Sequence, residues 1–342
     1  MKTTKIIAIL GILGFVLIIS NVVGSANVPV NNVLRIIMHR LFGFGDISGV
    51  SAAHVAIIWE LRLPRVLLAF IVGAALSVSG AIMQSILRNP LASSYTLGVS
   101  SGASFGAALV MFTGLPLLFN ATMAASGFVF GMATILLVIA IASKMDGRME
   151  NITIILVGMV LALFINAITT LLMSLNREQA QSLIFWQMGS FSLQQRWDAV
   201  ILLAPITLAG VLIALWYSRE LDMMTFGEEQ SQLMGVNLRQ TKWILLITAA
   251  AITGSSLAFV GIIGFVDLVA PHVIRRIFGS KHRLIIPLSA IFGGVFMMLC
   301  DLVARTIIAP SELPVGVVSA LIGAPFFGYV YFSRGRKIRA GS

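Results

Sequence analysis

Long apolar segments separated by short polar ones make up most of the chain. A helix needs roughly 20 apolar residues to cross a bilayer core about 30 Å thick, and on this measure the pattern predicts ten membrane-spanning helices. The predicted spans are 5–23, 64–84, 95–113, 121–143, 151–174, 197–217, 241–261, 262–278, 284–308 and 314–333. We therefore expect an all-α, polytopic membrane protein in which residues 1–342 form a single transmembrane domain.

Composition supports the same fold class. Apolar residues make up 58% of the 342 residues and charged residues only 11%, whereas about a quarter of a soluble chain is charged. The single cysteine, Cys300, excludes an intrachain disulfide and a zinc cage built from cysteines. The chain has no G-x-x-x-x-G-K-[ST] sequence, so it has no P-loop for nucleotide phosphates. We expect no bound cofactor or metal and no enzyme activity, and any ATP-driven process needs a separate chain.

The positions of the basic residues predict the orientation. A net charge of +10 would suggest nucleic acid in a soluble protein, but in a membrane protein basic residues gather in cytoplasmic segments. Lys2 and Lys5 precede the first span and further basic residues follow the last. Both termini are therefore expected in the cytoplasm, and nucleic acid is not an expected partner. A cleaved signal peptide is the alternative for the first apolar segment, and its loss would leave the other orientations unchanged.

The stretch GFVDLVAPHVIRR after the seventh span mixes apolar residues with charged ones. In the predicted orientation, His272, Arg275 and Arg276 lie at the cytoplasmic end of the eighth span. Pro271 lacks an N–H group and leaves the carbonyl one turn earlier without its helical partner. Asp267 lies about 6–9 Å deeper, where an ionised carboxylate is costly unless it is paired or hydrated.

The cytosolic segment between the sixth and seventh spans, about 219–242, is expected to contain a short helix. Thr225 followed by Glu228 matches a capping box, and Gly235 suits the C-terminal cap. This helix, near 226–234, would present apolar side chains beside acidic ones: Phe226, Leu233, Met234, Glu228 and Glu229. Acidic residues oppose an anionic inner leaflet, so a protein partner is preferred to the membrane surface.

Three arginines are expected near the outer surface. Arg62 and Arg65 surround Pro64 at the start of the second span, and Arg305 follows Asp301 by four residues in the ninth. Guanidinium groups on this side can receive carboxylates of an anionic solute or of a docking protein. For Arg305, an ion pair with Asp301 within one helix is the alternative.

The sequence GVSSG, 98–102, matches the G-x-S-x-G nucleophile pattern, and together with His272 it would suggest an intramembrane serine hydrolase. That pattern requires a turn between a strand and a helix. Here it lies in a segment rich in Gly, Ala and Ser, whose small side chains allow helices to pack closely. The packing interpretation is therefore preferred.

Taken together, the motifs resemble those of the transmembrane subunits of the ABC importers for iron-siderophores, haem and cobalamin, the type II importers. They are RLPRVLLAFIVGAALSVSGAIMQ, RNPLA with LGVSSGASFGA, FWQMGSF, LMG, GIIGFVDLVAPHVIRR, DLVAR and ELPVGVVSALIGAPFFGYVY, in this order. The resemblance implies a ten-helix subunit of a homodimer or heterodimer, with two cytosolic ATPase subunits that use ATP and Mg. It also implies a separate extracytoplasmic solute-binding protein and the cytoplasmic membrane of a bacterium or archaeon.

The resemblance assigns roles to residues of this chain. It implies that the loop Leu221 to Gly235 couples to the ATPase by docking in its cleft. It implies that Arg62, Arg65 and Arg305 line an outer pocket for acidic residues of the binding protein.

Four further residues are compared with the family motifs. Asn89 and Leu91 match the family's NPL turn, which forms part of the cytoplasmic gate. Asp267 stands where the family pattern GFxGLxxPHxxR usually has Gly. It is expected either to pair with a nearby Arg, Ser or backbone N–H, or to line a hydrated pathway; His272 is grouped with it as a polar residue of the pathway or the packing.

The expected function is that of a permease subunit that moves a large metal chelate, a ferric siderophore, by alternating access. Haem or cobalamin is the alternative cargo, because one chain does not distinguish among these chelates. Two other classes stay open: an ion-coupled secondary transporter, which would use membrane carboxylates such as Asp267 and Asp301, and the hydrolase built on Ser100.

Overall fold

The computed structural model describes residues 2–24, 26, 28–44, 46–114, 123–146, 149–192 and 197–339. Within these residues the regular structure is helical throughout, which confirms the predicted all-α class. In chain order the helices are α1 (Lys2–Val22), α2 (Val30–Phe42), α3 (Ala52–Ala56), the π-helix η1 (Ile57–Arg62), α4 (Leu63–Ile86), α5 (Val99–Thr113), α6 (Met123–Met145), α7 (Asn151–Leu175), α8 (Arg177–Gln187), α9 (Trp197–Trp216), α10 (Ser218–Met224), α11 (Glu228–Leu233), α12 (Leu238–Val260), α13 (Val266–Phe278), α14 (His282–Thr306) and α15 (Val315–Arg339).

Each of the ten predicted spans overlaps one helix, but not all of these helices reach membrane length. In the described part of the chain, seven helical segments are long and apolar enough to cross a bilayer, and α3, η1 and α4 together form one of them. Helix α5 has 15 residues and α13 has 13. The predicted positions of the helices are therefore confirmed, whereas α5 and α13 are shorter than a full span.

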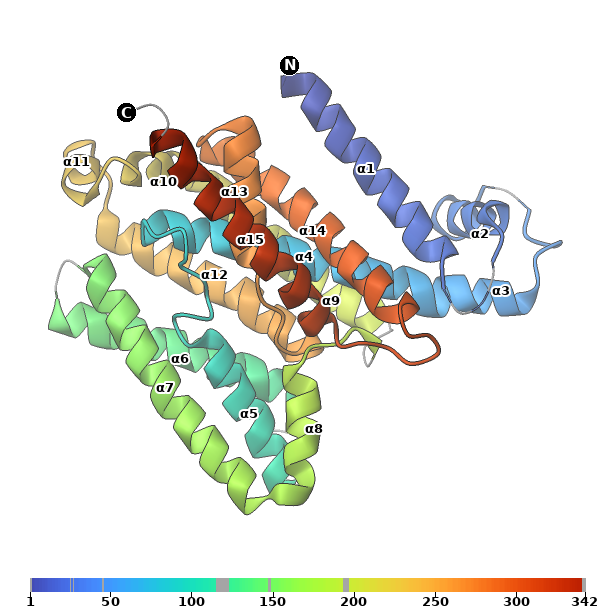
Figure 1. Ribbon diagram of the computed structural model, residues 1–342, viewed down its shortest axis with the longest axis horizontal. Helices are drawn as coiled ribbons and strands as arrows, with labels where there is room; N and C mark the ends of the chain where they lie inside the picture. The colour runs from blue at the N-terminus through green and yellow to red at the C-terminus, as the bar shows by residue number, and fades with distance from the viewer. Residues whose placement is uncertain are drawn as a thin grey trace.

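Helix α4 lies at the centre of the bundle, with α14, α12, α13 and α9 around it (Figure 1). Its sequence is rich in Gly, Ala and Ser, and almost every residue from Leu63 to Ile86 is buried. A Cβ atom on Gly73 would overlap the carbonyl oxygen of Gly293 in α14, and one on Gly80 would overlap that of Asp267 in α13. Small residues thus let the neighbouring backbones touch, as the packing interpretation predicted.

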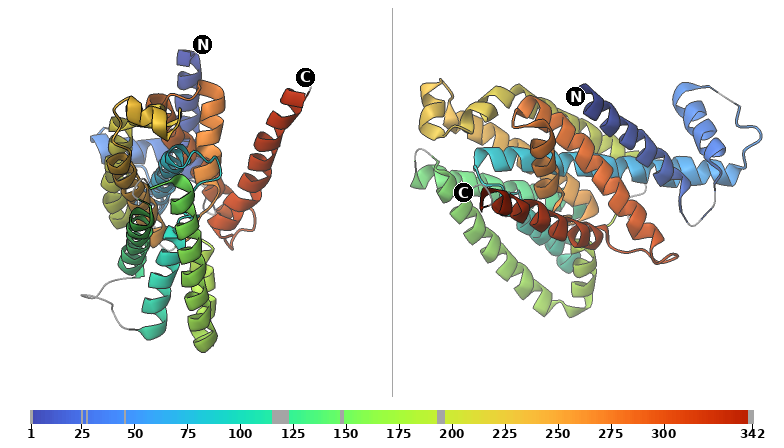
Figure 2. Two further views of the ribbon diagram at one scale, coloured as in Figure 1. Left: turned by 90° about the vertical axis from the view of Figure 1, so that its left-hand side faces the viewer. Right: turned by 45° about the horizontal axis from the view of Figure 1, so that its top comes forward.

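Helices α5, α6 and α7 form a second group beside this centre (Figures 1 and 2). A Cβ atom on Gly106 of α5 would lie 2.5 Å from the carbonyl oxygen of Ser126 in α6, and the Ser126 hydroxyl donates to the Gly106 carbonyl at 2.9 Å. Helix α7 exposes large apolar side chains such as Leu163 and Phe164. A membrane helix with such a face contacts lipid rather than water.

Two chain breaks explain why α5 and α13 begin later than predicted. Gly98 adopts a φ of +85° just before α5, and Gly261 and Phe265 adopt φ values of +76° and +70° before α13. The non-helical segment 261–265 is partly buried, and the Ser319 hydroxyl donates to the carbonyl oxygen of Gly264 at 3.2 Å. Irregular backbone at membrane depth requires such protein partners.

The N-terminal end of α1 and the C-terminal end of α15 lie toward the side of the bundle that carries α10 and α11 (Figure 1). Helices α2 and α3 lie at the opposite end. Both chain ends therefore lie on the same side of the bundle, as an even number of membrane crossings requires. In the predicted orientation, α10 and α11 are cytoplasmic and α2 and α3 are on the outer side.

Candidate functional site

The short helix predicted near 226–234 is α11, which spans Glu228–Leu233, and a further short helix that the sequence did not predict, α10, ends before it at Met224. The predicted capping box is wrong: the Thr225 hydroxyl donates to the carbonyl oxygen of Asp222 at 2.7 Å, and Gly227 is the N-cap of α11 without a side-chain hydrogen bond. Gly227 adopts a φ of +120°, which interrupts the helical backbone between α10 and α11.

The end of α11 agrees with the sequence. Gly235 adopts a φ of +89°, and its N–H donates to the carbonyl oxygen of Gln232 at 2.9 Å. Apolar side chains stand out from this segment, since Phe226 is 67% exposed and Leu233 is 88% exposed, and Met234 is also exposed. Large apolar side chains are therefore exposed on the α10–α11 segment at this end of the bundle.

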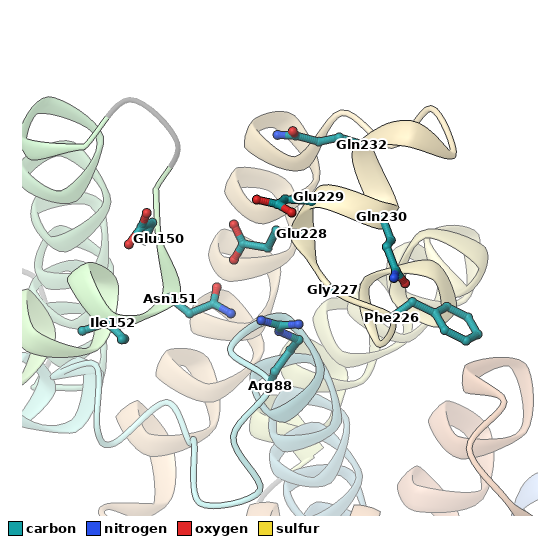
Figure 3. Close-up of a pocket in the computed structure, with 10 residues that line it drawn as sticks. All are labelled: Arg88, Glu150, Asn151, Ile152, Phe226, Gly227, Glu228, Glu229, Gln230 and Gln232. Atoms are coloured by element: carbon teal, nitrogen blue, oxygen red, sulfur yellow. The ribbon is translucent and has the colours of Figure 1, made fainter.

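A pocket of about 450 Å³ lies between α11 and the start of α7 (Figure 3). Arg88, from the turn after α4, points into the opening, and Glu228 and Glu229 of α11 point toward it from another side. Phe226 also lines the pocket, but its ring points away from Arg88 and from the two glutamates. The α10–α11 segment therefore presents two distinct surfaces, an apolar one and a charged one beside Arg88.

Lys242 holds this segment in place, which the sequence pattern did not reveal. Its Nζ atom donates to the carbonyl oxygen of Met149 at 2.6 Å and lies 2.8 Å from Glu228 Oε1. Lys242 is completely buried at the start of α12. Glu228, expected to be a free acidic residue of the loop, is thus an internal ion-pair partner, and Glu229 is the exposed one.

On the opposite side of the bundle, Arg65 lies at the centre of a cluster of charges. Its guanidinium Nη2 is 2.8 Å from Asp301 Oδ1, and its two Nη atoms donate to the two carboxylate oxygens of Glu312 at 2.9 and 3.0 Å. Arg65 and Asp301 are buried, and Glu312 is about one third exposed. Such a bidentate pair is strong and geometrically specific.

The other two arginines bind backbone carbonyls of the first helix and its end. Arg62 donates to the carbonyl oxygens of Asn21 and Val22 at 2.9 Å, and so satisfies groups left free at the C-terminus of α1. Arg305 donates to the carbonyl oxygen of Ser20, and its Nε lies 3.6 Å from Asp301 Oδ2. The pair within the helix predicted for Asp301 is therefore present, but Arg65 is its closer partner.

All three arginines line one cavity of about 310 Å³, together with Glu312 and Pro310. The structure thus brings together the residues expected on the outer side, Arg62, Arg65 and Arg305. Each of them already contacts a carboxylate or a carbonyl of this chain. An incoming carboxylate would compete with those partners, above all with Glu312.

The gate residues of the resemblance lie in the turn after α4. Asn89 Oδ1 accepts the N–H of Leu91 at 2.9 Å, which closes a local turn, and Leu91 is exposed. Arg88 adopts a φ of +48° just before them. This turn lies beside α11, since Arg88 shares a pocket with it.

Asp267 is the second residue of α13 and is buried. Its carboxylate lies near the Ser93 side chain and the backbone N–H groups of Asp267 and Leu268, and its Oδ2 atom is buried without a hydrogen-bond partner among the described residues. Both alternatives for Asp267, packing and a hydrated pathway, therefore stay open. The ring of His272 lies 5.8 Å from that of Phe327 in an edge-to-face arrangement.

The serine hydrolase alternative finds no support in the described residues. Val99 begins α5, and Gly98–Gly102 lies at the start of that helix, with a turn and no strand before it. The strand-to-helix elbow that exposes a nucleophilic serine is therefore missing from this part of the chain.

The bundle consists of membrane-length helices and shorter, interrupted ones. One end carries exposed apolar side chains and the other a charged pocket, which is an architecture typical of a transport permease. The chain belongs to the FecCD transport family, whose model matches residues 12–333. This confirms the family indicated by the sequence motifs.

Relatives and solved structures agree with this assignment. The ABC transporter permease protein YvrB of Bacillus subtilis, described as uncharacterized, is 40% identical over 93% of this chain and 90% of its own length. The cobalamin import system permease protein BtuC of Halobacterium salinarum is 36% identical, with coverage of 85% and 77%. A structure described as an inward-facing metal-chelate type ABC transporter superposes with a TM-score of 0.84 at 28% identity, with coverage of 97% and 99%. Other relatives at 34–36% identity are named for hemin in Yersinia pestis and Fe(3+)-citrate in Bacillus subtilis.

Proposed function

We propose that this protein is the membrane-spanning permease subunit of an ABC importer that carries a metal chelate across the cytoplasmic membrane, with a ferric siderophore as the cargo. The observation that carries the proposal is the match of almost the whole chain to the FecCD transport family and to a metal-chelate type transporter. Relatives of similar identity are named for cobalamin and hemin, which makes these chelates the second candidate.

The energy comes from separate ATPase subunits in this proposal, because the chain has no P-loop sequence. The α10–α11 segment is the surface on which an ATPase docks. Phe226, Leu233 and Met234 support this role, since large exposed apolar side chains are typical of the anchors of an interface. Closure of the ATPases would move α10 and α11 and shift the bundle between two states.

A solute-binding protein docks on the outer cavity lined by Arg62, Arg65 and Arg305. Charge complementarity supports acidic residues on that partner. Glu312 is the most exposed carboxylate of the cluster, so it is the internal partner that an incoming carboxylate would replace. A second copy of this chain or a related one completes the pathway.

The experiment that tests the proposal is purification of the tagged chain from its native membrane, with mass spectrometry of the co-purified proteins. A P-loop ATPase should be recovered with the native chain and lost with Leu233→Glu. The matched control is Leu41→Glu, an exposed leucine of α2 at the opposite end of the bundle, which should retain the ATPase. Recovery of the chain alone, in a form that moves solute on an ion gradient, would instead support the secondary transporter.

The cargo is tested in proteoliposomes that contain the recovered complex and its binding protein. ATP-dependent uptake of a ferric siderophore, with no uptake of haem or cobalamin, is the expected result. Uptake of haem or cobalamin alone would identify the second candidate and leave the transport class intact.

A further inference from the structure

His282 joins two helices that are distant in the sequence. It is the first residue of α14 and is 1% exposed. Its Nδ1 atom lies 2.6 Å from Asp222 Oδ1 of α10, and its Nε2 atom lies 2.6 Å from the hydroxyl of Ser85 near the end of α4. Because a carboxylate only accepts, Nδ1 is the atom that carries the hydrogen toward Asp222.

Asp222 also holds the backbone at this point. The backbone N–H of His282 donates to Asp222 Oδ1 at 2.8 Å, whereas Lys281, the N-cap of α14, makes no side-chain cap of its own. A carboxylate of α10 thus caps the first turn of α14, where the helix dipole favours negative charge. Two hydrogen bonds to one oxygen tie α10 to α14 both through the backbone and through the imidazole.

From Ser85 the hydrogen bonds continue across α4 into α13. Arg275 donates from Nη2 to the Ser85 hydroxyl at 2.8 Å and from Nη1 to Gln84 Oε1 at 2.6 Å. The amide nitrogen of Gln84 donates at 3.1 Å to the carbonyl oxygen of Asp267. That carbonyl is four residues before Pro271, so it is the one that the proline leaves without a helical partner.

These contacts form one series from α10 to the first turn of α13: Asp222, His282, Ser85, Arg275, Gln84 and the Asp267 carbonyl. Asp222 is partly exposed and Arg275 is half-buried, whereas His282, Ser85 and Gln84 are buried. Buried hydrogen bonds of this kind hold their geometry more firmly than exposed ones, because water does not compete for them. Movement of α10 would change the position of Asp222. Because Asp222 is bonded to His282, the displacement would reach α14, which carries His282, and α4, which carries Ser85.

We infer that His282 is the positioning residue through which displacement of α10 reaches α4 and α13, so that ATPase movement is converted into movement of the pathway helices. The inference rests on the proposed function, since it takes the displacement of α10 from docked ATPases. It goes beyond that function by naming the residues that transmit the movement.

The test uses the complete importer in proteoliposomes, with ATP hydrolysis and chelate uptake measured on the same preparation. His282→Ala and Ser85→Ala should each keep ATP hydrolysis near the native rate and lower uptake by about tenfold, the size of an ordinary coupling effect. Asp222→Asn keeps an oxygen that accepts from the imidazole and the backbone N–H, so it should restore most of the uptake that Asp222→Ala loses. His54→Ala, a half-buried histidine of α3 at the opposite end, is the control and should leave both rates unchanged.

The double variant Asp222→Ala with Ser85→Ala separates transmission from local damage. If both residues act through His282, the double variant loses no more uptake than the worse single variant; independent defects would multiply. Multiplied losses, an equal fall in hydrolysis and uptake, or native uptake in His282→Ala would each overturn the inference. A native complex that shows no ATP-dependent uptake would instead contradict the proposed function, because that result is independent of every variant.

Discussion

Lys242 Nζ lies 2.8 Å from Glu228 Oε1, although the lysine side chain is completely buried. The same ammonium group donates to the carbonyl oxygen of Met149, in the segment before α7. One side chain of α12 therefore holds both α11 and the connection from α6 to α7. A buried charge without its partner is strongly unfavourable, so the position of the surface segment depends on this pair.

Glu228→Gln should loosen the surface segment. The substitution removes the charge that balances Lys242, and because Glu228 is partly exposed, the cost is expected at about 2 kcal/mol, below the 3–5 kcal/mol of fully buried pairs. The apparent melting temperature of the purified protein should fall, and proteolysis should become faster between α10 and α12. Glu229→Gln removes an exposed carboxylate from the same helix and should change neither the melting temperature nor the rate of proteolysis. Equal behaviour of the two variants would show that Lys242 does not anchor α11.

Glu312→Gln should strengthen the binding of the solute-binding protein. Glu312 occupies both Nη atoms of Arg65, and a neutral amide is a weaker competitor for an incoming carboxylate. We expect the dissociation constant to fall by about tenfold, which corresponds to about 1.4 kcal/mol. Surface plasmon resonance with the protein in nanodiscs measures this directly.

Two variants complete that measurement. Arg65→Ala should weaken binding and should make it less sensitive to salt. Glu60→Gln removes an exposed acidic residue of η1 on the same side and should leave the affinity unchanged. Weaker binding by Glu312→Gln would mean that Glu312 orients Arg65 for the partner and does not compete with it.

The positions of the helices could be predicted because the apolar length of a segment and its content of small residues are properties of that segment alone. The starts of α5 and α13 were predicted too early, since Gly98, Gly261 and Phe265 interrupt the helices within segments that are apolar enough to be counted as continuous spans. The capping box predicted from Thr225 and Glu228 failed for a related reason, because Gly227 lies between them with a left-handed φ and is itself the N-cap of α11.

The parts of the site that depend on distant residues could not be predicted. Arg65 and Glu312 are 247 residues apart, and His282 is 197 residues from Ser85. Apolar periodicity and charge position contain no information about which helices are neighbours. The three outer arginines were found because they lie near the outer ends of predicted spans and in family motifs, whereas Lys242 and His282 are unremarkable in the sequence.

Gly80→Ala should disrupt the contact between α4 and α13. A Cβ atom at this position would overlap the carbonyl oxygen of Asp267, which is backbone and cannot move like the end of a side chain. Overpacking of this kind usually costs about 1–3 kcal/mol, and here it would also displace the acceptor of Gln84. The yield of folded protein and its melting temperature should both fall. Gly14→Ala in α1, with no atom within 4 Å of the added methyl group, should be neutral; a stable Gly80→Ala protein would show that α13 can shift freely.

Asp267→Asn should keep transport close to the native level. The close approach of α4 and α13 is provided by Gly80, so a side chain larger than glycine is accommodated at position 267. Asparagine has the shape of aspartate, so its side-chain oxygen can take the place of the carboxylate oxygen near Ser93 and the start of α13, and the loss of stability should stay near 1 kcal/mol. Asp267→Gly removes the side chain and should lower the melting temperature further, again without a selective loss of uptake. Uptake per folded molecule decides whether Asp267 serves packing or lines the pathway. The amide has nearly the shape of the carboxylate but no charge. If uptake falls in Asp267→Asn while expression and melting temperature are unchanged, the carboxylate therefore acts in the pathway.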